Sequence, residues 1–232
     1  MADVFFNGPA GRIEGKYFQS ENSKAPAALV LHPHPLYGGS MNNKVVYAIY
    51  KALLGQEMSV LRINFRGVGK SQGEYDGGVG ELTDAATAMD WLQLRNPLAE
   101  KFWIAGFSFG AWVAMQLIMR RPEINNFIAI SPPVNKFDFS FFSPCPVPGL
   151  IVQGSLDSIV PEQDVINFAD KLSKQKIRVE YNLIDGADHF YREKIPDLEN
   201  TITEYVANLF KQGEQNNFTS KKSKKSSQML LS

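Results

Sequence analysis

Short apolar runs alternate along this chain with segments of helical spacing, and this alternation limits its fold more than any other feature. Five runs are largely apolar on both faces, as are central strands of a parallel sheet covered by helices; they span residues 27–31, 60–65, 102–107, 127–130 and 150–152. Between them, apolar residues recur every three or four positions, which is the helical period. Residues 13–18 alternate in polarity and indicate an antiparallel edge strand. We predict one α/β domain over residues 1–210, with a mostly parallel sheet and helices on both faces.

The segment Gly106-Phe107-Ser108-Phe109-Gly110 matches the pattern G-x-S-x-G. It follows a predicted strand and opens a predicted helix, which is the context of a nucleophile elbow. The sharp turn lifts the serine hydroxyl above the sheet and crowds the flanking positions, so they must lack side chains. The helix start also points its free N–H groups toward a forming oxyanion. We therefore predict that Ser108 is a nucleophile rather than an incidental serine in a glycine-rich turn.

A serine nucleophile needs a base, and the chain has three histidines, at positions 32, 34 and 189. In hydrolases with such an elbow the chain order is serine, acid, histidine. Only His189 follows Ser108, and it lies in a loop after a predicted strand at residues 179–183. We predict that His189 is the general base.

The acid of the triad should follow a strand between the serine and the histidine. Asp157 lies just beyond the run at residues 150–152, and its carboxylate would hold the imidazole in one tautomer and stabilise the imidazolium. Asp185 and Asp188 are rivals, but they share the loop of His189 and would need a tight local turn to reach the far ring nitrogen. We predict that Asp157 is the acid.

Two N–H groups are needed to stabilise the oxyanion. One is that of Phe109, the residue after the nucleophile, and the other comes from the loop after residues 27–31. This loop reads His32-Pro33-His34-Pro35-Leu36-Tyr37-Gly38-Gly39. Its prolines have no N–H, which leaves His34, Leu36 or Tyr37, and we favour Leu36. His32 and His34 stand one residue apart with no third ligand in view, so we expect no metal site and no cofactor.

Charge and composition point to an ordinary globular protein rather than to a nucleic-acid or membrane protein. The 232 residues carry 24 basic and 24 acidic side chains, and the balance gives no overall attraction to nucleic acid. One cysteine, Cys145, allows no intrachain disulfide. The N-terminal residues lack the pattern of a signal peptide, and no run is long enough to span a bilayer. We expect a cytoplasmic protein, for which a homodimer is compatible with the sequence.

The last residues differ in composition from the rest. Residues 211–232 contain five lysines against one glutamate, with serine, asparagine and glutamine and few apolar residues. Such a segment cannot bury enough apolar surface to fold by itself. We expect a disordered basic tail, solvated rather than bound to an anionic partner.

The run Gly67-Val68-Gly69-Lys70-Ser71 ends like a phosphate-binding loop. The full pattern needs a glycine where Asn64 stands and a helix that begins at Lys70, but several glycines follow instead. We predict a surface loop in which Arg66 pairs with a carboxylate.

Two segments carry a resemblance to known hydrolases: the His32–Pro35 loop with Gly38-Gly39 and Asn42-Asn43-Lys44, and the run from Asn64 to Gly73. With the elbow, they make residues 4–210 similar to the α/β-hydrolase superfamily. More narrowly, the chain resembles a bacterial group of small hydrolases that is similar in design to dienelactone hydrolases and to the catalytic domains of prolyl peptidases. The resemblance implies an eight-stranded, mostly parallel sheet and a triad at Ser108, Asp157 and His189. It implies no substrate, and a serine stands at position 108 where dienelactone hydrolases have a cysteine.

The combined features predict a serine hydrolase of the esterase type that acts through an acyl-enzyme on small substrates with short acyl chains. Only about 18 residues, 131–148, separate two predicted strands, and five are proline, which leaves no room for a large helical lid. Phenylalanines at residues 137–142 either pack on the body or form a wall for the acyl group. A thioesterase, a small-peptide hydrolase and a non-catalytic interaction protein of the same fold remain alternatives.

Overall fold

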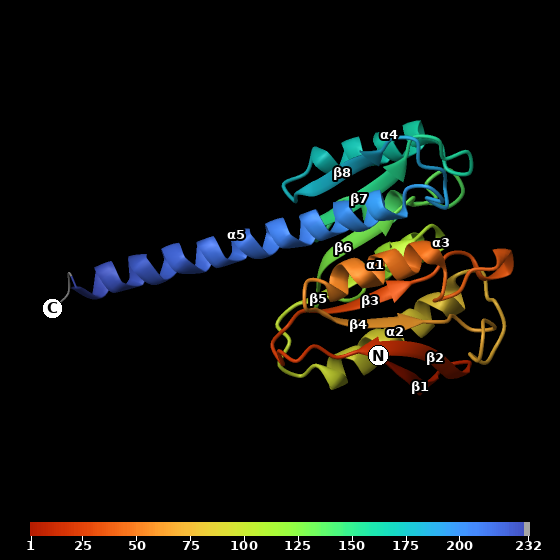
Figure 1. Ribbon diagram of the computed structural model, residues 1–232, viewed down its shortest axis with the longest axis horizontal. Coiled ribbons are helices and arrows are strands. Elements are labelled where there is room, and N and C mark those ends of the chain that lie inside the picture. The colour runs from red at the N-terminus through yellow and green to blue at the C-terminus, as the bar shows by residue number, and fades with distance from the viewer. Residues whose placement is uncertain (230–232) are drawn as a thin grey trace.

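The computed structural model describes residues 1–229, with side chains through residue 212. Eight strands form one sheet in the order β1-β2-β4-β3-β5-β6-β7-β8, as Figure 1 shows. The strands are β1 Ala2–Gly8, β2 Gly11–Phe18, β3 Ala27–Leu31, β4 Ser59–Ile63, β5 Phe102–Phe107, β6 Ile124–Ile130, β7 Gly149–Gly154 and β8 Val179–Ile184. All neighbours from β4 to β8 are parallel, whereas β2 is antiparallel to both β1 and β4. The predicted α/β architecture and its antiparallel edge are confirmed.

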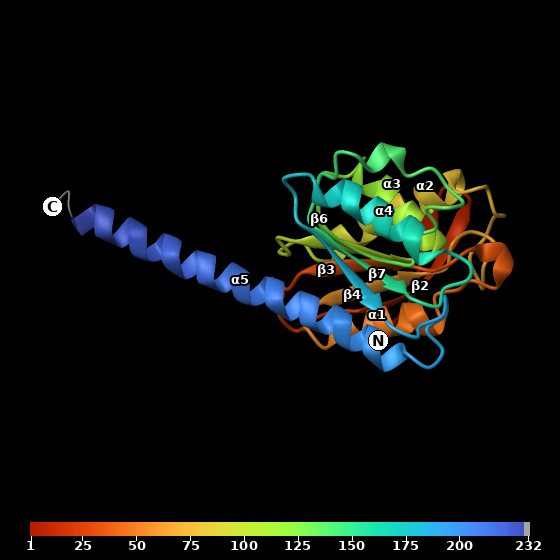
Figure 2. The same cartoon turned by 90° about the horizontal axis from the view of Figure 1, so that it is seen from above.

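Helices cover both faces of the sheet. The helices are α1 Lys44–Leu54, α2 Val79–Arg95, α3 Phe109–Ile118, α4 Glu162–Ser173 and α5 Ile195–Met229. Figure 2 shows α2, α3 and α4 on one face, with α1 and α5 on the other. The loop between β6 and β7 contains only a short 3-10 helix, η2 Ser140–Phe142. Residues 1–229 therefore include no helical lid over the carboxyl ends of the strands.

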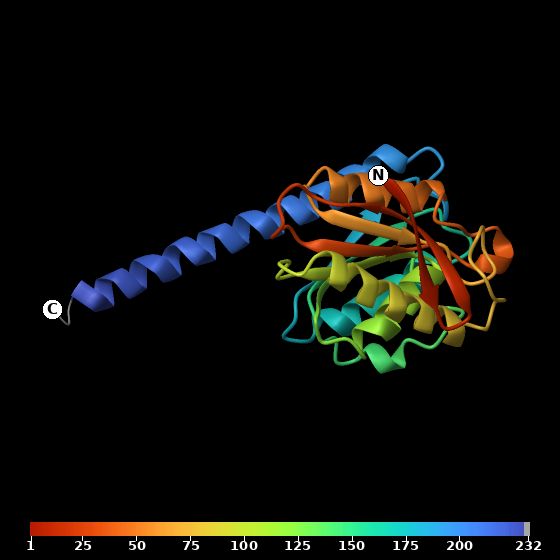
Figure 3. The same ribbon diagram turned by 90° about the horizontal axis from the view of Figure 1, so that it is seen from below.

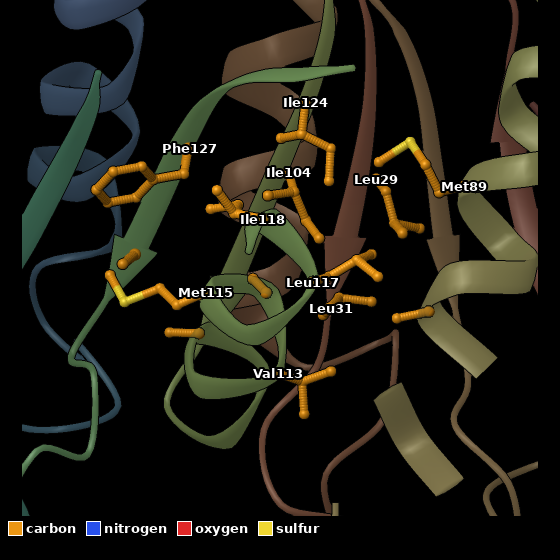
Figure 4. Packing of buried hydrophobic residues seen from close by; sticks show 14 of the residues in the cluster. Leu29, Leu31, Met89, Ile104, Val113, Met115, Leu117, Ile118, Ile124 and Phe127 are labelled. Atoms are coloured by element: carbon orange, nitrogen blue, oxygen red, sulfur yellow. The ribbon is translucent and has the colours of Figure 1, made fainter. Parts of the chain in front are cut away.

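Apolar residues on successive positions of a strand serve two separate cores, which explains why the central strands are apolar throughout. In β3, Leu29 and Leu31 join the core under α2, α3 and α4, while Ala28 and Val30 join the core under α1 and α5. Figure 4 shows Leu29 and Leu31 among side chains of the first core, with Met89 of α2 and Met115 of α3. Burying one such aliphatic side chain contributes about 1.5–3 kcal/mol.

Residues 211–229 of the segment that we expected to be disordered are helical in the structure. Helix α5 continues through it to Met229, and residues 230–232 lie outside the described residues. Within the described side chains, α5 packs on the body through Leu198, Ile202, Tyr205, Val206, Leu209 and Phe210. Beyond them the helix runs away from the body (Figure 3). The segment contains no proline and many lysines and glutamines, which have high helix propensity, so the docked turns can propagate.

The loop that resembles a phosphate-binding loop is closed by a carboxylate. Glu14 Oε2 accepts hydrogen bonds from the Lys70 N–H at 2.7 Å and from the Asn64 side chain at 2.8 Å. Arg66 donates to both carboxylate oxygens of Asp84, from Nε at 3.0 Å and from Nη2 at 2.8 Å. The predicted pairing of Arg66 with a carboxylate is confirmed.

Among the described residues, we find no helix with both the length and the apolar character that spanning a membrane requires.

Candidate active site

Ser108 stands alone between the end of β5 and the start of α3, in a strained backbone conformation. Its φ is 53° and its ψ is −119°, a region that residues with a side chain rarely adopt. Its N–H donates to the carbonyl of Ile130 at 2.8 Å, which ties the turn to the end of β6. The strain and this tie together raise the serine above the carboxyl edge of the sheet.

The glycines on either side of the turn are required by space. A Cβ on Gly106 would lie 2.3 Å from the carbonyl carbon of Gly110, and a Cβ on Gly110 would lie 2.5 Å from the carbonyl oxygen of Leu31. Both distances are too short for any side chain, so helix α3 can approach β3 and β5 only with glycine at these positions. The spacing of G-x-S-x-G is thus explained by packing.

The three residues predicted as a triad meet in the structure, although they come from loops after β5, β7 and β8. His189 Nε2 lies 3.2 Å from the Oγ of Ser108, and His189 Nδ1 lies 2.7 Å from Oδ2 of Asp157. With the carboxylate ionised, Nδ1 donates its proton to Asp157 and Nε2 is free to accept the proton of the serine hydroxyl. This is the arrangement a general base needs.

The rival carboxylates have other partners. Asp188 accepts hydrogen bonds from the N–H groups of Phe190 and Arg192, each at 3.1 Å. Asp185 accepts one from the Ser155 hydroxyl at 3.1 Å. Neither carboxylate contacts a ring nitrogen of His189 within the described residues, so the geometry favours Asp157.

Asp157 is buried and held by several donors. Its Oδ1 accepts from the N–H groups of Ile159 at 2.9 Å and Val160 at 2.8 Å, and its Oδ2 also accepts from the Gln153 side chain at 3.1 Å. Burial acts to raise the pKa of Asp157, but the hydrogen bond from His189 and those from the two amides outweigh it, so the pKa is lowered. The carboxylate stays ionised and keeps its orientation toward the imidazole.

The N–H group favoured for the oxyanion hole is already bonded. The Leu36 N–H donates to Nδ1 of His34 at 3.3 Å, and the Tyr37 N–H donates to the His34 carbonyl at 3.1 Å. The amide N–H of His34 donates to no acceptor among the described residues, and its ring packs against that of Phe109, with centroids 4.9 Å apart. Our preference for Leu36 therefore changes to His34, which was one of the three candidates. Phe109 is the first residue of α3, so its N–H has no acceptor within the helix.

His32 is a structural residue. Its Nε2 accepts from the Phe65 N–H at 3.0 Å and its Nδ1 donates to the Pro33 carbonyl at 2.6 Å. Because burial disfavours the charged ring, the pKa of His32 is lowered to about 4. Both nitrogens are occupied, and the described residues contain no cluster suited to a metal ion.

Of the four phenylalanines at residues 137–142, which could either pack on the body or form a wall for the acyl group, two are core residues. Phe142 is fully buried and Phe139 nearly so. Phe137 stacks on Trp112 with centroids 4.3 Å apart and meets the edge of Phe109 at 5.9 Å. Of these rings, Phe137 is therefore the one tied to the elbow. A groove of about 400 Å³ between this loop and α4 is lined by none of the triad residues.

Two buried residues near the triad were not identified from the sequence. The Tyr191 hydroxyl lies 3.0 Å from Oγ of Ser131, and Tyr191 is two residues beyond His189. No local pattern marks either residue, because their contact joins positions 60 apart in the chain.

Comparison with known proteins agrees with this geometry. The chain matches the model of the dienelactone hydrolase family over residues 74–218. It is 54% identical to an uncharacterized protein of Rickettsia prowazekii (strain Madrid E), over the whole length of both chains. Among solved structures, it is similar to a protein of unknown function from Agrobacterium tumefaciens, with 47% identity, 91% of this chain and 97% of that chain covered, and a TM-score of 0.88.

The chain is also similar to two further solved structures, a serine hydrolase homologue and a serine hydrolase. One is an α/β serine hydrolase homologue from Coxiella burnetii, with 34% identity, coverage of 88% of this chain and 97% of that chain, and a TM-score of 0.80. The other is an α/β serine hydrolase without a lid from Xanthomonas campestris, with 32% identity, coverage of 90% and 94%, and a TM-score of 0.81. The sheet, the elbow and these similarities agree that the chain belongs to the dienelactone hydrolase family of α/β hydrolases.

Proposed function

We propose that this hydrolase is a serine esterase that cleaves small carboxylic esters with short acyl groups through an acyl-enzyme on Ser108. The observation that carries the proposal is the continuous contact from Ser108 Oγ through His189 to Asp157, at 3.2 Å and 2.7 Å. An aligned base and a buried, ionised acid activate a serine hydroxyl that is otherwise a weak nucleophile.

The proposed reaction has two steps. In the first, Ser108 Oγ attacks the ester carbonyl as His189 Nε2 takes its proton, and the proton then passes to the leaving alcohol. The N–H groups of Phe109 and His34 stabilise the oxyanion. In the second, His189 takes a proton from water as the water oxygen attacks the acyl carbon; the bond to Ser108 Oγ then breaks, His189 returns the proton to Oγ, and the carboxylic acid leaves.

The same triad serves thioesters and small peptides, so the class of acyl substrate is decided by activity panels. A non-catalytic role in protein interaction is disfavoured by the filled triad positions and their spacing. The absence of a lid in the β6–β7 loop supports small, freely diffusing substrates.

Covalent labelling with a fluorophosphonate, beside hydrolysis of p-nitrophenyl acetate, tests the proposal. We expect labelling of the wild-type protein and none of Ser108→Ala, with kcat lowered on the order of 10⁴-fold. Thioester and peptide panels on the same preparations separate the alternatives. Full labelling of Ser108→Ala, or no Ser108-dependent hydrolysis of any acyl substrate, would refute it.

A further inference from the structure

Hydrogen bonds fix both the backbone and the ring of His34. Its carbonyl accepts from the N–H groups of Tyr37 and Gly39, each at 3.1 Å. Its Nδ1 accepts from the Leu36 N–H at 3.3 Å, and its Nε2 lies 3.1 Å from the Tyr75 hydroxyl. Every polar group of the residue except its own amide N–H is therefore occupied by the loop or by Tyr75.

Aromatic packing reinforces these bonds. The imidazole of His34 lies between the rings of Tyr37, Tyr75 and Phe109, at centroid distances of 4.7, 4.9 and 4.9 Å. The loop also closes tightly behind it, because a Cβ on Gly39 would lie 2.0 Å from the Pro33 carbonyl oxygen. The ring is thus a fixed support between the loop and the residue after the nucleophile.

The hydrogen bonds determine which nitrogen carries the proton. Nδ1 accepts from an N–H group, so it must be unprotonated, and the single proton of the neutral ring lies on Nε2 and is donated to the Tyr75 oxygen. A second proton at Nδ1 would set it against the Leu36 N–H, donor against donor. Protonation therefore breaks the bond by which His34, the N-cap residue, caps the 3-10 helix η1 Pro35–Tyr37.

We propose that the neutral imidazole of His34, oriented by the Tyr75 hydroxyl, is a positioning group that holds the oxyanion loop in its active form, and that its protonation disables hydrolysis in acid independently of His189. This inference rests on the proposed esterase function, because it concerns the loop that donates the His34 N–H.

Charged groups on two elements influence the pKa of this imidazole. Burial is the largest influence and lowers the pKa of His34; Glu81 of α2 acts to raise it, and Lys136 of the β6–β7 loop acts to lower it. The neighbouring His32 stays neutral above about pH 4, because burial lowers its pKa to about 4. The pKa of His34 is thus below its ordinary value, and the loop stays intact at neutral pH and opens as the pH falls.

Three variants separate positioning from general stability. His34→Asn removes the titrating ring but keeps an oxygen that can cap the Leu36 N–H, as asparagine does at helix starts. His34→Leu removes both. Tyr75→Phe removes only the hydroxyl that orients the ring. All three retain the amide N–H at position 34.

The decisive measurement is how kcat/KM for p-nitrophenyl acetate falls with pH on the acid side. The released p-nitrophenol is measured after each sample has been quenched. If two separate protonations, one of them at His34, abolish activity in acid, the plot of log kcat/KM against pH approaches a slope of two in the wild type. His34→Asn removes one of these protonations and should approach a slope of one. We also expect His34→Leu to lose more kcat than His34→Asn, and Tyr75→Phe to lose about three- to tenfold in kcat with KM unchanged. Circular dichroism at each pH confirms that all proteins remain folded.

A slope of one in both the wild type and His34→Asn overturns the inference, as does a Tyr75→Phe variant with wild-type kcat. Failure of the esterase proposal is recognised separately, because the wild type would then show no Ser108-dependent hydrolysis at neutral pH.

Discussion

The hydroxyl of Tyr191 lies 3.0 Å from the Oγ of Ser131, and both residues have a positive φ, of 52° and 44°. Ser131 follows β6, and its N–H donates to the Val152 carbonyl at 2.8 Å. The preceding residue, Ile130, accepts the N–H of Ser108. One buried contact thus joins the loop of the histidine to the strand ends that carry the serine and the acid. The surrounding structure keeps both residues in these strained backbone conformations.

Removing this hydroxyl should loosen the histidine loop. We expect Tyr191→Phe to lower the free energy of unfolding by about 1–2 kcal/mol, because a buried hydroxyl partner is lost, and to lower kcat about three- to tenfold as His189 moves from its bonding position. Chemical denaturation and steady-state kinetics measure both effects.

Tyr205→Phe is the matched control. The Tyr205 hydroxyl bonds Asn126 Oδ1 at 3.1 Å, and it is also buried, but Asn126 lies near the amino end of β6. It should cost similar stability and leave kcat unchanged. Equal losses of kcat in both variants would contradict a local role for Tyr191.

Asp157→Asn should lower kcat by roughly 10²- to 10⁴-fold with KM little changed, because an amide favours the wrong tautomer of His189. Asp188→Asn is the control, since that carboxylate bonds its own loop. Parallel kinetics on short esters decide the matter: if Asp188→Asn is inactive and Asp157→Asn is near wild type, the acid has been assigned wrongly.

Burial of His32 makes stability depend on pH. Its pKa is lowered from 6.5 to about 4 in the folded chain. As the pH falls from about 6.5 to about 4, the unfolded chain binds a proton that the folded chain does not, and the free energy of unfolding falls by up to about 3 kcal/mol. Urea denaturation between pH 7 and 4.5 should show a shallower dependence in His32→Gln, whose amide oxygen can still accept the Phe65 N–H. The same slope in both proteins would refute this account.

Substrate size should be limited by the open site. With Phe139 and Phe142 in the core, little apolar wall remains to receive additional methylenes, each worth up to about 0.8 kcal/mol when buried. We expect kcat/KM for p-nitrophenyl esters to peak at about two to six acyl carbons, without a rate increase above the solubility limit. A steady rise to twelve carbons or more would argue for a long acyl groove.

The outer part of α5 should be dispensable. All its described side chains that join the core precede Lys211, so deletion of residues 214–232 should leave the melting temperature and activity unchanged. Deletion from residue 209 removes Leu209 and Phe210 as well and should lower the melting temperature. A loss of several degrees in the shorter deletion would show that the outer segment contributes to stability.

Local sequence patterns predicted the order of strands and helices and the elbow. The elbow, together with chain order, predicted the triad candidates. The run 27–31 is apolar at every position because both faces of β3 are covered. The glycines around Ser108 are demanded by backbone contact within the turn and with β3. The histidine and the acid followed from chain order, since few candidates stand after the serine.

Other features depend on which groups meet in space, and the sequence alone determined none of them. Whether the Leu36 N–H was free depended on the orientation of the His34 ring, which Tyr75 and Phe109 hold from other elements. Whether the phenylalanines of the β6–β7 loop lined the site or filled the core depended on the path of that loop. The contact of Ser131 with Tyr191, in the loop of His189, joins residues 60 positions apart in the chain. Hydrogen bonds and packing between distant segments form only when the chain is folded, so the spacing of residues along the sequence does not predict them.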